Sequence, residues 1–225
     1  MIKFLEAIRY GLKRTLHQPL FSFYKYYTRK ERDFKYDGLI IRLLPGIFHP
    51  WFFGSTIIFL NWLRCKNLTS KEIMELGAGN GLISLVLARD GGEVTATDIS
   101  PTAVQALREN ARRNCIDLKI IHSDLFEKVH DRGFDYVLIN PPYFPRDPST
   151  EAEHAFYCGA DFDYFNRLFS QLVTRAPTEM VWIILSENCD LDRIHAIAKG
   201  KELSLLPVHK ERRLFEWFYI FEVRR

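Results

Sequence analysis

The sequence lacks the features of several large protein classes. Its four cysteines form no C-x-x-C pair, and their scattered spacing fits neither a zinc ribbon nor the disulfide framework of a small secreted domain. No uncharged apolar stretch reaches the ~18 residues of a membrane-spanning helix. The first 16 residues also lack the unbroken apolar core of a signal peptide. We therefore expect a cytoplasmic protein with no transmembrane segment and no structural disulfide.

The whole chain has little net charge, but its N-terminal part is strongly basic. The formal net charge is only +3 for 225 residues. Residues 1–36 nevertheless carry nine Lys and Arg against three Asp and Glu, together with nine aromatic residues. The remainder is slightly acidic. This contrast predicts a basic, aromatic-rich extension over 1–37 and a larger domain over 38–225.

The predicted extension has three open interpretations. Apolar residues at positions 2, 5, 8, 12 and 16 repeat at helical spacing, which predicts a short helix. Basic residues interleaved with aromatics favour contact with RNA, where phosphates and exposed bases meet cations and ring faces. An amphipathic helix can instead lie on an anionic membrane surface or a partner protein. The third interpretation is a helical lid that packs on the domain.

Beyond Gly38, segments typical of strands and helices alternate. Apolar or alternating runs predict strands over 72–76, 93–98, 118–122, 134–139, 180–185, 203–206 and 218–223. Apolar residues at helical spacing predict helices over 55–65, 82–89, 101–114, 162–172 and 191–198. This alternation predicts an α/β domain with a mostly parallel sheet. The charged stretch 210–213 is expected to be a solvated loop.

The first candidate site follows the strand predicted over 72–76, in the segment Glu75-Leu-Gly77-Ala-Gly79-Asn-Gly81. A glycine-rich turn between a strand and a helix lets a ligand approach the backbone closely. The glycine spacing differs from the NAD fingerprint. Glu75 would repel a pyrophosphate but suits a ligand with a cationic amine. A glycine turn alone is weak support for nucleotide binding, so the neighbouring strands matter.

Two acidic residues follow the next two predicted strands. Asp98 lies 21 residues after Gly77, a distance at which an acid can bind ribose hydroxyls. The other interpretation is a helix cap, although Ser100 is predicted to cap the helix that begins at Pro101. Asp124 could accept a hydrogen bond from an adenine amino group, or it could be an ordinary turn residue.

The strand predicted over 134–139 ends in Asn140-Pro141-Pro142-Tyr143. The two prolines fix the backbone and carry no N–H, so the Asn140 side-chain oxygen and the Pro141 carbonyl can form a pair of acceptors. Such a pair suits a planar NH₂ group, and Tyr143 offers a face for stacking. A nitrogen held in this way is aimed at an electrophile. Asn-Pro-Pro is also a common turn sequence, but its place after a strand, downstream of the glycine turn, favours a site.

Together, ELGAGNG, TATD and NPPY resemble the class I S-adenosylmethionine-dependent methyltransferases, over roughly residues 45–225. NPPY is similar to the motif of the enzymes that methylate amino nitrogens of glutamine, adenine and guanine. The resemblance implies a seven-stranded Rossmann-like sheet, mostly parallel with an antiparallel last strand. It also implies S-adenosyl-L-methionine as the cofactor, and in-line transfer that depends on positioning more than on a strong base.

The resemblance implies a role for each candidate residue. Asp98 would bind the cofactor's ribose and Asp124 its adenine. The methionine part of the cofactor would lie near four residues, namely Glu75, Gly77, Gly79 and Gly81. The target nitrogen would meet the catalytic group Asn140, Pro141 and Tyr143, of which Asn140 also borders the cofactor.

A finer resemblance concerns the substrate. The segment 155–159 with Arg167 is similar to the A-x-x-G-G…R stretch of the release-factor glutamine methyltransferases. Residues 48–50 and 213–225 resemble the archaeal and eukaryotic branch of that family. Cys158 replaces the first glycine of that pattern, and Phe162 stands where a later glycine is expected. NPPYFP equally resembles enzymes that modify adenine N6 in transfer RNA. The predicted acceptor is therefore a protein glutamine, for example in a translation factor, with a base amine of tRNA or rRNA as the alternative.

Other functions fit less well. A non-catalytic cofactor-binding scaffold would not need the intact NPPY segment. Cys158 has no neighbouring His and Asp pattern that would make it a nucleophile, and a buried thiol is the commoner case. His49, His122 and His154 are too dispersed for a metal motif, so no metal is expected.

Overall fold

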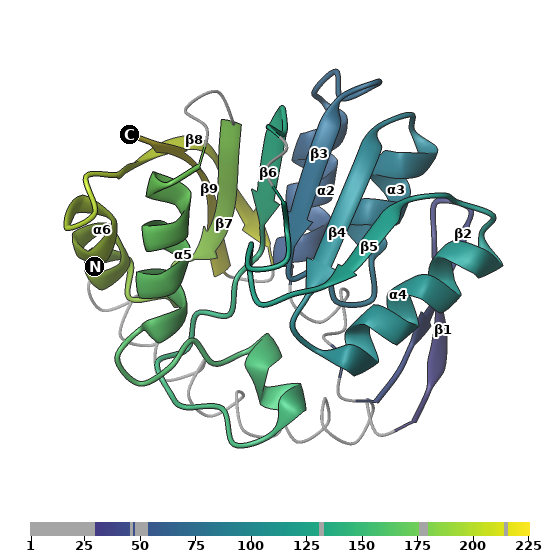
Figure 1. The fold of residues 1–225 in the computed structure, drawn as a ribbon, viewed down its shortest axis with the longest axis horizontal. Helices are drawn as coiled ribbons and strands as arrows, with labels where there is room; N and C mark the ends of the chain where they lie inside the picture. Colours follow the sequence, from purple (N-terminus) through teal and green to yellow (C-terminus); the bar gives the residue numbers. More distant parts are fainter. Residues whose placement is uncertain (1–29, 46, 48–53, 131–132, 176–179, 214–215) are drawn as a thin grey trace, which may run out of the picture.

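The computed structural model describes residues 30–45, 47, 54–130, 133–175, 180–213 and 216–225. Their strands form two sheets (Figure 1). The smaller sheet is a hairpin of β1 (Arg32–Tyr36) and β2 (Leu39–Leu43). The larger sheet has seven strands in the order β5-β4-β3-β6-β7-β9-β8.

The large sheet is parallel except at one strand. Its members are β3 (Glu72–Leu76), β4 (Glu93–Asp98), β5 (Lys119–His122), β6 (Tyr136–Ile139), β7 (Met180–Ser186), β8 (Ser204–Arg213) and β9 (Glu216–Arg224). Strand β9 runs antiparallel to both β7 and β8, while the other pairs are parallel. The predicted Rossmann-like methyltransferase sheet is thus confirmed.

Helices cover both faces of this sheet. They are α2 (Ser55–Arg64), α3 (Leu82–Arg89), α4 (Pro101–Arg113), α5 (Asp163–Val173), α6 (Leu191–Lys199) and a short 3₁₀ helix (Glu151–Ala155). One hydrophobic cluster joins α2, α3 and α4 to the sheet, and a second joins α5 and α6 to it. The result is a three-layer α/β/α arrangement (Figure 1).

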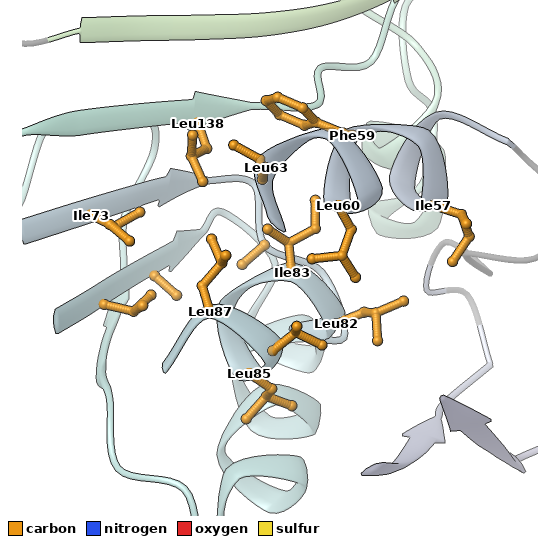
Figure 2. Close-up of a cluster of buried hydrophobic side chains, with 14 of the residues drawn as sticks. Ile57, Phe59, Leu60, Leu63, Ile73, Leu82, Ile83, Leu85, Leu87 and Leu138 are labelled. Carbon is orange, nitrogen blue, oxygen red and sulfur yellow. The ribbon is translucent and has the colours of Figure 1, made fainter. Parts of the chain in front are cut away.

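Helix α2 is anchored firmly in the first cluster. Its residues Phe59, Leu60 and Leu63 are fully buried in the cluster that joins α2 to α3 and the sheet, and Leu60 points toward Ile83 of α3 (Figure 2). Burial of each such side chain stabilises the fold by about 1.5–3 kcal/mol. This packing fixes the position of the N-terminus of α2, which borders the candidate site.

The strands and helices that the periodicity predicts are present, with shifts of a few residues at their ends. The prediction for 210–213 was wrong, because these residues form the second half of β8. Strand β8 lies at the edge of the sheet. An edge strand has only one neighbouring strand and is largely exposed, so it can carry charged residues. The Lys210 ammonium instead lies 4.4 Å from the Trp217 ring on β9, a cross-strand contact that a search for apolar runs cannot find.

The described part of the predicted extension is a strand rather than a helix. Residues 32–36 form β1, which pairs with β2 across the turn at Asp37 and Gly38. The hairpin is attached to α4, because the Asn110 and Asn114 side chains each hydrogen-bond both ways to the β2 backbone. The helix predicted over 2–16 lies outside the described residues. Among the helices that the structure describes, none is long and apolar enough to cross a membrane.

Candidate active site

The candidate site lies at the carboxyl ends of four parallel strands. Strands β4 and β5 follow β3 toward one edge of the sheet, whereas β6 and β7 lie on the other side of β3. The chain therefore leaves β3 and β6, which are neighbours, in opposite directions. Such a switch point opens a crevice in which ligands of α/β proteins bind. The register pairs Leu76 with Ile139, so the glycine turn and Asn140 begin side by side.

The three glycines of the turn serve two different purposes. All have positive φ values, of 70°, 57° and 86° for Gly77, Gly79 and Gly81, a region that other residues rarely adopt. A Cβ added to Gly77 would meet no atom within 4 Å, and one at Gly79 would meet only Ile47, at 3.8 Å. A Cβ at Gly81 would lie 2.0 Å from Leu107. The first two glycines thus leave open space, and the third allows close packing of α3 on α4.

Glu75 is a buried carboxyl group at the end of β3. Its side chain accepts a hydrogen bond from the Ser84 hydroxyl of α3. Burial raises the pKa of Glu75 to about 7, and the nearby Asp98 acts in the same direction. A cationic group placed in the cavity would favour the ionised form. The structure therefore places at this position an acid that lacks a cationic partner among the described residues.

Asp98 organises the backbone around the end of β4. Its carboxylate accepts hydrogen bonds from the Gly79 N–H at 2.8 Å and from the Ser100 N–H at 2.9 Å. Burial raises the pKa of Asp98, although these two N–H groups oppose the shift. Ser100 caps α4 by accepting from the Ala103 N–H at 3.0 Å, as predicted. Asp98 therefore links the glycine turn to the start of α4 rather than serving as the cap.

Asp124, after β5, pairs with a residue of α5. Its carboxylate forms an ion pair with Arg167, and both side chains border the cavity. The half-buried Tyr164 of α5 borders the same cavity. Burial, together with the nearby Asp98 and Asp124, raises the pKa of its hydroxyl, so Tyr164 stays neutral. Sequence reasoning did not find Tyr164, because a tyrosine on an apolar helix face looks like a core residue.

The NPPY segment is held from two sides. The Asn140 side-chain N–H group donates to the Thr56 hydroxyl of α2 at 3.1 Å. Among the described residues, no group donates a hydrogen bond to the Asn140 side-chain oxygen. The Tyr143 hydroxyl is hydrogen-bonded to Ser186 at the end of β7, and burial raises its pKa, so the phenol stays protonated.

A single cavity of about 350 Å³ joins these groups. This volume lies within the range of small-molecule and cofactor sites. Every residue predicted for the site borders the cavity except Gly81, which packs against Leu107 instead. Sequence reasoning missed Ser55 and Thr56, since the segment STIIF reads as a buried helix. It also missed Glu151, which accepts from the Ser100 hydroxyl and the Thr102 N–H and so ties the segment after NPPY to α4.

Two departures from the glutamine methyltransferase pattern can be placed in the structure. Phe162 has φ 60° and ψ 36°, a left-handed conformation that explains why a glycine suits this position. Cys158 is buried, 2% exposed, and burial raises the pKa of its thiol to about 11. As predicted, it is a buried thiol and not an activated nucleophile.

A family comparison identifies the domain that carries this site. The model of the family described as methyltransferase small domain matches residues 39–161, more than half of the chain. The chain belongs to the methyltransferase small domain family. The match spans β2 to the loop before α5 and includes the glycine turn, Asp98, Asp124 and Asn140. The predicted methyltransferase identity is thus confirmed.

Curated relatives of this methyltransferase domain differ in their named substrates. The "Putative protein N5-glutamine methyltransferase" of Methanocaldococcus jannaschii is 37% identical over 110 residues, which are 48% of this chain and 53% of that protein. The ribosomal RNA small subunit methyltransferase C of Escherichia coli is 31% identical over 144 residues, 61% of this chain and 40% of that protein. The chain thus spans about half the length of the curated relatives it matches.

Solved structures share the fold of this methyltransferase domain. The 16S rRNA N2 methyltransferase RsmC of T. thermophilus, in complex with AdoMet and guanosine, has a TM-score of 0.61 at 19% identity, covering 87% of this chain and 50% of that one. The Mtq2–Trm112 complex of E. cuniculi, which methylates the termination factor eRF1, has a TM-score of 0.62 at 20% identity, covering 80% of this chain and 99% of that one. These likenesses concern the fold.

Proposed function

We propose that this protein transfers the methyl group of S-adenosylmethionine to an amino or amide nitrogen of a macromolecule. One observation carries the proposal. The Asn140 amide is held on its N–H side by Thr56, its oxygen receives no hydrogen bond from the described residues, and Asn140 borders the same cavity as the glycine turn and Asp98. These features support an acceptor for N–H groups beside the proposed nucleoside site.

The cavity residues fit S-adenosylmethionine. Gly77 and Gly79 leave room that any side chain would fill. Glu75 is a buried acid and Asp98 a half-buried one. Both have raised pKa values, which a cationic ligand with ribose hydroxyls would compensate. The buried Ser55 hydroxyl has no hydrogen-bond partner within the described part of the chain, and buried polar groups are normally satisfied by a partner. When bound, this cofactor supplies an electrophilic methyl group on a positively charged sulfur.

The protein's own residues position the acceptor. The Asn140 oxygen and the Pro141 carbonyl accept the two N–H groups of the acceptor, and the Tyr143 ring lies against it. Held in this way, the acceptor nitrogen would direct its lone pair toward the methyl group that the bound cofactor would supply, and it would lose a proton to solvent after the transfer. Because Tyr143 stays protonated, it does not act as a base. Orientation therefore supplies most of the rate.

A glutamine side chain of a protein is the acceptor that we favour. The M. jannaschii relative bears that substrate in its name, and the E. cuniculi complex acts on a translation termination factor. The alternative is the exocyclic amine of an RNA base, adenine N6 or guanine N2, which the E. coli and T. thermophilus proteins support. Both acceptors present an NH₂ group on a planar system, so the Asn140–Pro141 pair suits either.

The proposal is tested by transfer of tritiated methyl groups from S-adenosylmethionine into cell extract by the full chain. The expected result is label in a macromolecular fraction that protease removes and ribonuclease does not. Label removed by ribonuclease alone would make an RNA amine the acceptor. No label in either fraction, with a folded protein, would contradict the proposed activity.

A further inference from the structure

The start of α2 contributes two hydroxyl groups to the cavity. Ser55 and Thr56 are 1% and 7% exposed, and both border the cavity next to Asn140. Thr56 lies 84 residues before Asn140 in the chain, so the contact exists only after α2 has docked on the sheet. The burial of Phe59, Leu60 and Leu63 in the cluster that joins α2 to α3 and the sheet determines where this end of α2 lies (Figure 2).

The Thr56 hydroxyl touches the part of Asn140 that decides the direction of its amide. An asparagine amide has an accepting oxygen and a donating nitrogen, and a rotation of 180° about χ2 exchanges them. Only the orientation that directs the oxygen to the substrate can accept an N–H of the acceptor. With the Asn140 nitrogen on Thr56 at 3.1 Å, the oxygen is left for the substrate.

We infer that Thr56 is a positioning residue that holds the Asn140 amide in the orientation needed for methyl transfer. The inference rests on the proposed function, since it acts through Asn140. Thr56 itself touches no reacting atom. If its hydroxyl is lost, the Asn140 side chain loses the hydrogen bond that anchors it in the observed orientation. The side chain then samples other orientations, and the fraction of productive complexes falls while the cofactor's own contacts remain.

The chain offers a closely matched control. Thr95 on β4 is 8% exposed, almost the same as Thr56, but it does not border the cavity. Thr56→Val and Thr95→Val are the same isosteric exchange of a buried hydroxyl for a methyl group. Any general effect on folding should therefore be common to both variants, whereas an effect on Asn140 should be confined to Thr56→Val.

The experiment measures initial rates of tritiated methyl transfer into extract, together with the cofactor Kd by calorimetry and the melting temperature. Thr56→Val should reduce the rate about tenfold, as expected for a lost neutral hydrogen bond that directs a reacting group, and should leave the cofactor Kd within about twofold. Thr56→Ser, which keeps the hydroxyl, should restore most of the rate. In an Asn140→Ala background, Thr56→Val should have no further effect. Thr56→Ala serves in place of Thr56→Val if the latter does not fold.

The outcomes separate this inference from the proposed function. A native rate in Thr56→Val, or an equal loss in Thr56→Val and Thr56→Ser, overturns the positioning role while the transfer rate of Asn140→Ala is still strongly reduced. Additive losses in the Asn140→Ala background also overturn it. A native rate in Asn140→Ala, or no cofactor binding by the native chain, contradicts the proposed function itself.

Discussion

The two halves of the site are assembled in different ways. In the half beside β3, β4 and β5, the contact at the glycine turn is short-range: Asp98 accepts from the Gly79 N–H, 19 residues away, within adjacent strand–helix units. The half beside β6 depends on α2, because the hydrogen bond between Asn140 and Thr56 joins residues 84 apart. The first half is set by local backbone geometry, and the second by the docking of a distant helix.

This difference suggests a division of labour. The first half offers buried acids and open space around glycines, which suit a bound cofactor. The second half offers an oriented amide, which suits the acceptor of the methyl group. If the division is correct, substitutions in one half should change transfer and leave cofactor binding intact, and substitutions in the other should do the reverse.

The largest effect is expected at the acceptor half. Asn140→Ala should lower the transfer rate about 100- to 1000-fold, as for other lost groups that stabilise a transition state. The cofactor Kd from calorimetry should change by less than about threefold. Asn61→Ala on α2 is the control, because its side chain contacts Tyr36 and does not border the cavity. A parallel loss of rate and cofactor affinity in Asn140→Ala would show that the halves are not separable.

The next effect concerns the cofactor half. Asp98→Ala should raise the cofactor Kd about 10- to 100-fold, since it removes a charged acceptor from the glycine turn and the ribose site. Asp190→Ala is the control. Like Asp98, Asp190 accepts a hydrogen bond from a backbone N–H, that of Arg193, where it caps α6. That control should lose about 1 kcal/mol of stability with no change in Kd. An unchanged Kd in Asp98→Ala would mean that the ribose assignment is wrong.

A smaller effect should depend on pH. Because the pKa of Glu75 is raised to about 7, a cationic cofactor must displace a proton below that pH. Its Kd should therefore rise as the pH falls from 7, by at most about tenfold per pH unit. Glu75→Gln should bind more weakly at pH 8 and lack this part of the pH dependence. Calorimetry at pH 5.5 to 8 distinguishes the two proteins.

The same group affects stability with the opposite sign. In the free protein, the folded state holds the Glu75 proton up to about pH 7, whereas the unfolded chain releases it near the ordinary value of 4.5. This contribution to stability is complete below about pH 4.5 and is lost as the pH rises to 7. The free energy of unfolding, measured by urea denaturation at a series of pH values, should therefore fall more steeply between pH 4.5 and 7 in the native protein than in Glu75→Gln. Parallel curves would contradict the raised pKa.

The smallest effect compares two glycines of one turn. Gly81→Ala should lower the free energy of unfolding by about 1–3 kcal/mol, from the contact with Leu107 and the positive φ. Its folded fraction should keep the native cofactor Kd. Gly77→Ala shares the positive φ but projects into open space, so it should weaken cofactor binding several-fold. Equal effects of the two on Kd would reject the distinction between packing and binding.

The cofactor half could be predicted from the sequence and much of the acceptor half could not. Glu75, Gly77, Asp98 and Asp124 each lie at or just after the end of a predicted strand, so the rule that parallel strands end at one edge of the sheet brings them together. Thr56 and Ser186 could not be found, because no periodicity tells which buried hydroxyl will meet NPPY after folding. The hairpin of β1 and β2 was missed for a similar reason, since its outer edge is supported by asparagines of α4.

The central claim is that one edge of the sheet binds S-adenosylmethionine independently of the amide that positions the acceptor. The most direct measurement is calorimetric titration of S-adenosylmethionine into the native full chain and into Asn140→Ala. We expect one binding site per chain and the same Kd for S-adenosylmethionine in both proteins. Absence of binding to the native protein, or loss of binding in Asn140→Ala alone, would contradict it.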